Sequence, residues 1–402
     1  MSVDEAVAMI TARIDAVQET ETVLLTEADG RVLAEAITAP MALPPFTNSA
    51  VDGYAVRSGD LALVAQQAFP ITGRIAAGES ATSSVETGQA VQIFTGAPMP
   101  EGADTVFMQE DVRVEGKQVR LPAGLRAGAN VRPAGEDVPK GSEALPAGRR
   151  LRPQDVALIA ALGLTRVKVR RPVRVAVFST GDELIAPGEV RVTPQLYDSN
   201  RFMLMAMLRR LGCAVGDLGI LRDDPGALAL ALKAAAHDHD LLLTSGGVST
   251  GEEDHVKAAI KRVGSLVLWR MAIKPGRPVA MGVIDGTPFI GLPGNPVASF
   301  VTFTYVVRPA VMALAGASAD RPLPIPVRAT FAYRKKISRR EYVRATIRRG
   351  EDGTFEATKF PREGAGLLSS LVETDGLVEL GEDVTAVKPG DIVRFLSYAS
   401  LT

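Results

Sequence analysis

The sequence has very few of the residues that form cross-links and transition-metal centres. Its 402 residues include one cysteine, Cys213, and three histidines. A single cysteine excludes an intramolecular disulfide and a cysteine-cluster metal site. Three histidines also argue against a multi-histidine metal centre such as a zinc site. The composition therefore fits a reducing compartment, and we expect a cytoplasmic protein that does not use zinc.

The chain also has almost no net charge, because 45 basic residues are balanced by 46 acidic ones. An attraction to nucleic acid or to an anionic membrane would therefore have to come from a local patch. Residues 1–5 lack the basic-then-apolar order of a signal peptide, and we expect no export. The most apolar window, 297–315, contains Arg308-Pro309, which would break a membrane-spanning helix. We predict a buried helix there and no membrane association.

The periodicity of the first half predicts a helical region interrupted by a β-rich one. Residues 3–17 and 24–36 have apolar side chains at helical spacing. Prolines and glycines then separate short β-like runs as far as about residue 139, and helical spacing returns at 151–162. The β-rich part is therefore expected to be an insertion in a helical part.

Residues 172–320 predict a doubly wound α/β domain. Apolar runs at 173–179, 241–244 and 289–292 are each followed by a glycine-containing loop and a helical stretch. Such sheets bind ligands where loops leave the carboxyl ends of the strands. Residues 199–200 are expected to cap a helix over 201–211, with Met203, Met205 and Met207 in the core.

The loops of this region carry charges suited to a phosphorylated ligand. The loop 245–249 (SGGVS) could cradle a phosphate with its backbone N–H groups, and acids follow it at 252–254. Carboxylates suit Mg²⁺, whereas Arg270, Lys274 and Arg277 suit an oxyanion. The plainer interpretation also stands: acids commonly cap helices, and Arg270 would lie on a solvated strand.

A stiff, proline-rich linker at 321–326 leads into a small β domain. This domain is locally basic between residues 334 and 349 and carries interleaved aromatic residues. Base stacking on a small barrel is one hypothesis. A solvated basic face that attracts an anionic small substrate is the favoured one, so no nucleic-acid partner is expected.

Taken together and in order, seven segments make the chain resemble the molybdopterin molybdenumtransferase (MoeA) family and the related E-type domain of gephyrin, over essentially the full length. They are 48–55 (NSAVDGYA), 94–98 (FTGAP), 135–137 (GED), 179–184 (STGDEL), 245–249 (SGGVS), 273–276 (IKPG) and 291–296 (GLPGNP). The resemblance implies insertion of molybdate into adenylylated molybdopterin, with release of AMP and with Mg²⁺.

The resemblance also implies an elongated homodimer of four-domain, α/β multidomain subunits. The expected parts are a helical domain (1–19, 39–46, 140–171), an inserted β-rich domain (20–38, 47–139), a molybdopterin-binding α/β domain (172–320) and a C-terminal β barrel (321–402). The expected transient partners are a molybdopterin adenylyltransferase and apo-molybdoenzymes.

The resemblance assigns roles to individual residues. Catalytic positions would be Asp52, Thr95, Asp137, Glu183 and Lys274, and Mg²⁺ would be held by Glu183, Asp223 and Asp254. Substrate would be bound by Arg132, Ser199, Ser245, Gly246, Gly247, Ser249, Arg270, Lys274, Pro293, Gly294 and Pro296. Asp52, Thr95, Arg132 and Asp137 would come from the other subunit. Arg270 and Arg277 stand where lysine is common, which keeps the charge but changes the donor geometry.

Two alternatives stay open at this point. A scaffold of the same fold could bind molybdopterin or a partner protein without turnover. A nucleic-acid binder would use residues 328–349 and would bind in a salt-sensitive way. The acidic and basic loop positions favour the enzyme, because a scaffold needs only the fold.

Overall fold

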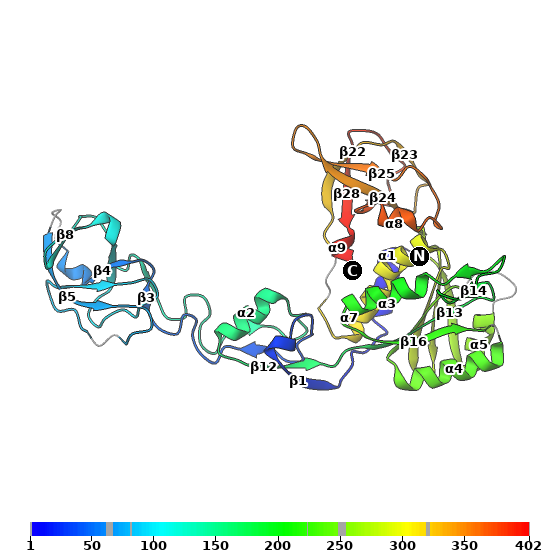
Figure 1. The fold of residues 1–402 in the computed structure, drawn as a ribbon, viewed down its shortest axis with the longest axis horizontal. Coiled ribbons are helices and arrows are strands. Elements are labelled where there is room, and N and C mark those ends of the chain that lie inside the picture. The colour runs from blue at the N-terminus through cyan, green and yellow to red at the C-terminus, as the bar shows by residue number, and fades with distance from the viewer. Residues whose placement is uncertain are drawn as a thin grey trace.

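Four folded parts lie along an elongated molecule (Figure 1). The computed structural model describes residues 2–61, 67–80, 83–222, 224–247, 255–318 and 322–401. A β-rich unit occupies one end and a slender arm the middle. The α/β domain and the C-terminal barrel lie together at the other end. The α/β multidomain fold with a C-terminal barrel is thus confirmed.

The arm is built from segments that lie far apart in the sequence. β1 (Thr20–Leu24) pairs antiparallel with β12 (Arg166–Arg170), and β2 (Ile37–Thr38) pairs with β11 (Glu143–Leu145). Helix α2 (Pro153–Ala161) completes this part. Its core contains Val23, Leu33, Ile37, Leu145, Leu151, Ile159, Val167 and Val169.

This arrangement differs from the predicted division at residues 1–38. Residues 20–38 belong to the arm rather than to the inserted unit, because Val23 is buried opposite Val167 in the β1–β12 pair. Helix α1 (Val3–Thr11) belongs to the α/β domain, whose core takes up its apolar face. The helix predicted at 24–36 is wrong: the described structure there has a single 3₁₀ turn, η1 (Leu25–Glu27).

The inserted unit is β-rich. Its sheet has the order β7-β4-β6-β5-β9-β8, and β3 (Asn48–Ser49) pairs separately with β10 (Val131–Arg132). The six strands are β4 (Gly53–Val56), β5 (Gln67–Ile75), β6 (Ala90–Ile93), β7 (Thr105–Met108), β8 (Arg113–Glu115) and β9 (Gln118–Leu121). The β3–β10 pair joins the two ends of the insertion where the chain enters and leaves it.

The α/β domain contains a six-stranded sheet in the order β16-β13-β17-β21-β20-β18. The first four strands are parallel, β20 runs antiparallel to them, and β18 pairs antiparallel with β20. They are β13 (Arg174–Thr180), β16 (Ala214–Leu221), β17 (Leu241–Ser245), β18 (Gly264–Arg270), β20 (Pro278–Ile284) and β21 (Thr287–Leu292). The three strands predicted from apolar runs are all present, and all three are parallel.

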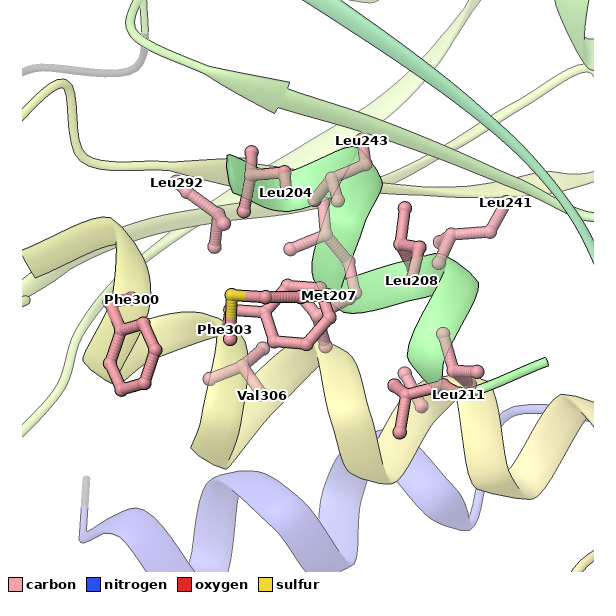
Figure 2. Packing of buried hydrophobic residues seen from close by; sticks show 14 of the residues in the cluster. Leu204, Met207, Leu208, Leu211, Leu241, Leu243, Leu292, Phe300, Phe303 and Val306 are labelled. Atoms are coloured by element: carbon pink, nitrogen blue, oxygen red, sulfur yellow. The ribbon is translucent and has the colours of Figure 1, made fainter. Parts of the chain in front are cut away.

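Helices cover both faces of this sheet. On one face lie α1, α3 (Asn200–Arg210) and the long helix formed by α6 (Pro296–Thr302), the π turn η4 (Phe303–Val307) and α7 (Arg308–Leu314). α4 (Pro225–Asp238) and α5 (His255–Val263) cover the other face. In Figure 2, α3 leucines lie between sheet leucines and Phe303 of the long helix. Met205 and Met207 are buried in this core, as predicted.

The long helix confirms the predicted buried helix. It is the one helix in the described part of the chain that is long and apolar enough to cross a membrane, and 83% of its most apolar window is buried. It does not break at Arg308-Pro309, because the π turn before Arg308 accommodates a proline that lacks an N–H donor.

The C-terminal domain is a closed barrel. β24 (Arg340–Arg349) pairs with β25 (Phe355–Lys359) on one side and with β26 (Gly376–Leu380) on the other, which closes the sheet. β22 (Ile325–Ala329) and β28 (Ile392–Ser397) complete it. β19 (Ile273–Lys274), from the α/β domain, pairs with the start of β24 and fixes the two domains together.

Candidate functional site

The main candidate site lies at the switch point of the α/β sheet. From β13 the chain passes through α3 to β16 on one side, and it returns through α4 to β17 on the other side of β13. Loops therefore diverge at the carboxyl ends of β13 and β17, which leaves a crevice there. A cavity of about 400 Å³ occupies this position, with Ser179, Thr180, Asn200, Ser245 and Gly294 in its lining. We call it the switch-point pocket.

Two glycine turns narrow this pocket. Gly246 has φ +96°, a conformation that glycine adopts without strain. A Cβ at Gly294 would lie 3.8 Å from the Gly246 Cα, so the two turns approach closely. Backbone groups, rather than side chains, form this edge of the pocket.

Buried polar atoms in and beside the pocket lack partners. Ser179 Oγ, Thr180 Oγ1 and Asn200 Oδ1 line it, and Thr244 Oγ1 lies on the adjacent strand; within the described ranges none of the four has a hydrogen bond. A buried polar group without a partner costs about 1–3 kcal/mol, so three at one cavity are explained best by a polar ligand.

Two helices begin at this pocket. α3 begins at Asn200 and α6 at Pro296, and neither Ser199 nor Asn295 caps its helix through a side-chain hydrogen bond. The predicted capping role of Ser199 is therefore wrong; Asp198 accepts a hydrogen bond from Arg201 N instead, at 3.3 Å. The positive ends of both helix dipoles favour an anionic ligand group.

Two carboxylates line the switch-point pocket, and only one of them is free to bind a metal ion. Asp198 is buried and lies 2.8 Å from Arg201 Nε, so its charge is already paired. Glu183 is exposed at the rim. The other two predicted Mg²⁺ ligands, Asp223 and Asp254, and the predicted phosphate contact Ser249 lie outside the described residues. Elsewhere, no group of three potential ligands is assembled in the ranges that the structure describes.

A second cavity of about 330 Å³ lies between the α/β domain and the barrel, and it shares Asn295 with the switch-point pocket. Four cationic side chains line it, against two acidic ones. The cations are Lys274, Arg344, Lys359 and Arg362, and the acids are Glu341 and Glu363. We call it the basic pocket, and its net positive charge suits an oxyanion.

Lys274 is held in this pocket by groups from the barrel. Its Nζ lies 3.1 Å from the Tyr333 hydroxyl and 3.3 Å from Glu341. Burial alone would lower the pKa of Lys274, but the bond to Tyr333 and the charge of Glu341 outweigh it and raise the pKa. Burial would raise the pKa of Glu341, but Tyr333, Arg339 and Lys274 together lower it. Lys274 is therefore a fixed cation at neutral pH and not a proton acceptor.

Most of the predicted substrate-binding residues that the structure describes line one of these two pockets. Ser199, Ser245, Gly246, Gly294 and Pro296 line the switch-point pocket, and Pro293 and Lys274 line the basic pocket. Gly247 follows Gly246 directly. Arg270 ends β18, the edge strand of the sheet, where it is exposed and in the lining of neither pocket. The structure does not bring Arg270 to the oxyanion position expected for it.

The remaining predicted residues belong to the inserted unit and its junction with the arm, and this unit lies at the opposite end of the molecule from the two pockets (Figure 1). Asp52 accepts hydrogen bonds of 2.7 Å from both the backbone N–H and the hydroxyl of Thr95, and these bonds hold the pKa of Asp52 below its ordinary value. Arg132 lies 3.6 Å from Glu136, and Asp137 is exposed nearby. Within one chain, this group is separate from both pockets.

The basic run at 334–349 is less available than the sequence suggests. Arg340 pairs with Asp4, Glu379 and Glu382, and Arg339 pairs with Glu341. Lys335 donates to the backbone carbonyl of Val384 at 2.6 Å. Three of the eight basic residues in this run are therefore engaged within the barrel or at its contact with α1.

Several residues at the pockets were not assigned a catalytic or substrate-binding role from the sequence: Ser179, Thr180, Asn200, Tyr333, Arg344, Lys359 and Arg362. Ser179 and Thr180 end a predicted strand, and their position at its carboxyl end is a usable signal. Asn200 was interpreted only as part of a helix cap. The barrel residues carry no local motif, because their role depends on the docking of two domains.

Comparisons with known proteins agree along the whole chain. Three family descriptions match successive parts: "MoeA N-terminal region (domain I and II)" at 1–163, "Probable molybdopterin binding domain" at 176–313 and "MoeA C-terminal region (domain IV)" at 326–398. A molybdopterin molybdenumtransferase of Haemophilus influenzae is 37% identical over 397 residues, covering 98% of this chain and 97% of its own.

A second relative and a solved structure show the same likeness. A molybdopterin molybdenumtransferase of a Nostoc species is 34% identical, covering 96% of this chain and 90% of its own. The crystal structure of the molybdopterin biosynthesis moeA protein from Pyrococcus horikoshii OT3 superposes with a TM-score of 0.83 at 30% identity, over 99% of this chain and 100% of that one.

Proposed function

The chain belongs to the molybdopterin molybdenumtransferase family, and from this premise we propose that it inserts molybdate into adenylylated molybdopterin, with release of AMP and with Mg²⁺. A transferase role in molybdenum cofactor biosynthesis follows from the family itself. The identity of the adenylylated substrate, the leaving group and the metal are the further steps of the proposal.

The single observation that carries the proposal is the set of unpartnered polar atoms at the switch-point pocket. Ser179, Thr180 and Asn200 offer hydrogen bonds that only a polar ligand can complete. A pterin ring has donors and acceptors for these side chains. The ligand's phosphate would lie at the α3 and α6 N-termini, where backbone N–H groups and the helix dipoles favour negative charge.

Molybdate would enter the adjoining basic pocket. Lys274 is a fixed cation there, and Arg362 has no ion pair among the described residues. Charge-assisted hydrogen bonds from such groups suit a tetrahedral dianion. Because both pockets share Asn295, molybdate and the pterin substrate would meet at their junction.

The donor available for a metal fits Mg²⁺ in part. Glu183 supplies a carboxylate at the rim of the switch-point pocket, and Mg²⁺ in proteins commonly binds one or two carboxylates, substrate phosphates and water. When bound, Mg²⁺ would neutralise charge on the phosphoanhydride. The chain's own groups bind and orient: the helix N-termini hold the phosphate, and Lys274 holds the oxyanion.

A homodimer would complete the site. Asp52, Thr95, Arg132 and Asp137 lie too far along one chain to reach its own pockets, and an elongated shape lets one subunit reach its partner's (Figure 1). We propose a cytoplasmic homodimer that receives its substrate from a molybdopterin adenylyltransferase and delivers its product to apo-molybdoenzymes. No nucleic-acid or membrane partner is included in the proposal.

AMP release tests this function directly. Purified protein is incubated with adenylylated molybdopterin and Mg²⁺, with and without molybdate, and the product is used to reconstitute an apo-molybdoenzyme. We expect AMP release that requires molybdate and stops when Mg²⁺ is chelated. Tight binding without AMP release would overturn the proposal and favour a molybdopterin-binding scaffold.

A further inference from the structure

The hydrogen bonds around Asn200 fix which end of its side-chain amide faces the switch-point pocket. The atom assigned as Nδ2 lies 2.7 Å from the carbonyl oxygen of Gly294 and 2.8 Å from Ser245 Oγ. A carbonyl oxygen can only accept, so the end that faces Gly294 must be the amide nitrogen. Asn200 Oδ1 is therefore the end left over, buried and without a donor in the described part of the chain.

The hydroxyl of Ser245 is already committed. It accepts from Asn200 and donates to the carbonyl oxygen of Pro293 at 3.2 Å. A serine has only one proton to donate, so Ser245 cannot donate to a ligand without breaking that bond. Through these two bonds, Ser245 holds the Asn200 amide and the turn at Pro293 in place.

The start of α3 holds Asn200 from the other side. Asp198 and Arg201 are both buried, and Arg201 Nε lies 2.8 Å from the Asp198 carboxylate. Arg201 also pairs with Asp217 on β16. A charge-paired, buried first turn leaves Asn200 little freedom to rotate away from the pocket.

We propose that Asn200 is the specificity-determining residue of the switch-point pocket, with Oδ1 accepting an N–H of the ligand's heterocycle, and that Ser245 is a positioning residue. This inference rests on the proposed function, in which the ligand is molybdopterin with N–H donors along one edge of its pterin ring. A ring without such a donor would leave a buried acceptor unpaired and would bind more weakly.

Two small rings test the proposal on the wild-type protein. One is hydroxymethylpterin; the other is its dimethyllumazine analogue, in which methylated ring nitrogens and a second carbonyl leave no N–H. Affinity is measured through the fluorescence of the rings. The wild type is expected to prefer the pterin by about tenfold or more. Equal affinity for the two rings, or no binding of the pterin, would overturn the inference.

Two variants distinguish the contact of Asn200 with the ligand from the positioning of Asn200 by Ser245. Asn200→Leu keeps the branching at Cγ and removes the acceptor, so the preference for the pterin should disappear. Ser245→Ala should weaken both rings alike and keep the preference. A preference that survives Asn200→Leu, or that is lost in Ser245→Ala, would contradict the assigned roles. If circular dichroism shows that Asn200→Leu is unfolded, Asn200→Ala takes its place.

The outcome of the ring-binding test can be distinguished from the outcome of the AMP-release test of the proposed function. Molybdate-dependent AMP release is measured on the same wild-type preparation. If the protein releases AMP but its ring preference does not depend on Asn200, only the present inference fails. If it binds the pterin with an Asn200-dependent preference and releases no AMP, the transferase proposal fails and the recognition role stands.

Discussion

Lys274 Nζ lies 3.3 Å from the buried carboxylate of Glu341, and this ion pair joins β19 of the α/β domain to β24 of the barrel. Arg339 and the Tyr333 hydroxyl contact the same carboxylate. Glu341 thus organises both the domain contact and the cationic wall of the basic pocket.

Removing the charge of Glu341 should lower the free energy of unfolding by an amount that depends on pH. The pKa of Glu341 is lowered from its ordinary value of 4.5, so its stabilisation is present above that value and is lost as the pH falls through the lower, folded-state pKa. We expect Glu341→Gln to lose about 1–3 kcal/mol of unfolding free energy at pH 7. The loss should shrink below pH 4.5, and urea titrations across this range would reveal it. An equal loss at every pH would count against the ion pair.

Gly276 provides a test of the loop that carries Lys274. It has φ +106°, and a Cβ there would lie 2.3 Å from Thr302 Oγ1. Gly276→Ala should therefore cost more than the roughly 1–3 kcal/mol of a strained backbone alone, because Thr302 must also move. It should also reduce transferase activity by displacing Lys274.

Gly286 is the matched control for this substitution. It has φ +88°, but nothing lies within 4 Å of the position that a Cβ would take there. Gly286→Ala should show only the backbone cost and keep its activity. Equal destabilisation of the two variants in urea would show that the clash with Thr302 does not matter.

The α/β domain was predictable because its signals are local. Apolar runs such as 241–244, each followed by a glycine loop, mark parallel strands whose carboxyl ends must share an edge. The predicted contacts at Ser245, Gly246 and Gly294 therefore fell at one pocket. The C-terminal β domain was likewise predicted to follow the proline-rich linker at 321–326.

What the sequence did not reveal depends on contacts between distant segments. The helix-like spacing at 24–36 gave way to a 3₁₀ turn and to single β-bridges of Val32 with Arg150 and of Leu33 with Val169. These bridges span more than a hundred residues, which no local period records. Asn200 was interpreted as a cap because its partners, Ser245 and Gly294, come together only in the fold. Arg270 is exposed because β18 lies at the edge of the sheet. The order of the strands in the sheet cannot be read from a local sequence motif.

Arg362 should contribute to capture of the oxyanion. It lines the basic pocket, lies over the Phe360 ring at 5.6 Å and has no carboxylate partner within the ranges that the structure describes. Arg362→Ala removes one charge-assisted donor, so the molybdate concentration for half-maximal rate should rise about tenfold while the maximal rate changes little. Molybdate titrations of AMP release measure both quantities.

A substitution at the acidic residue Glu363 is the opposite-charge control for Arg362→Ala. It lies in the same pocket, 3.4 Å from Lys359. Glu363→Gln removes a negative charge, so the molybdate requirement should fall rather than rise. The same direction of change in both variants would mean that the pocket's charge does not govern molybdate capture.

The distance between Asp52 and the two pockets leads to a test of subunit complementation. Asp52→Ala removes the acceptor for Thr95, and Lys274→Ala removes the cation of the basic pocket. Each variant alone should fold and lose about a hundredfold or more of its activity. If the site is shared, a mixed dimer has one site with both defects and one with neither.

Mixing the two inactive variants should therefore restore activity. Random exchange of subunits in a twofold-symmetric dimer would give about a quarter of the wild-type rate. The mixture is unfolded and refolded together, and AMP release is compared with that of each variant treated alone. If Asp52 instead acted within its own chain, every site would keep one defect and mixing would restore nothing. Recovery would thus assign Asp52 and Lys274 of one site to different subunits.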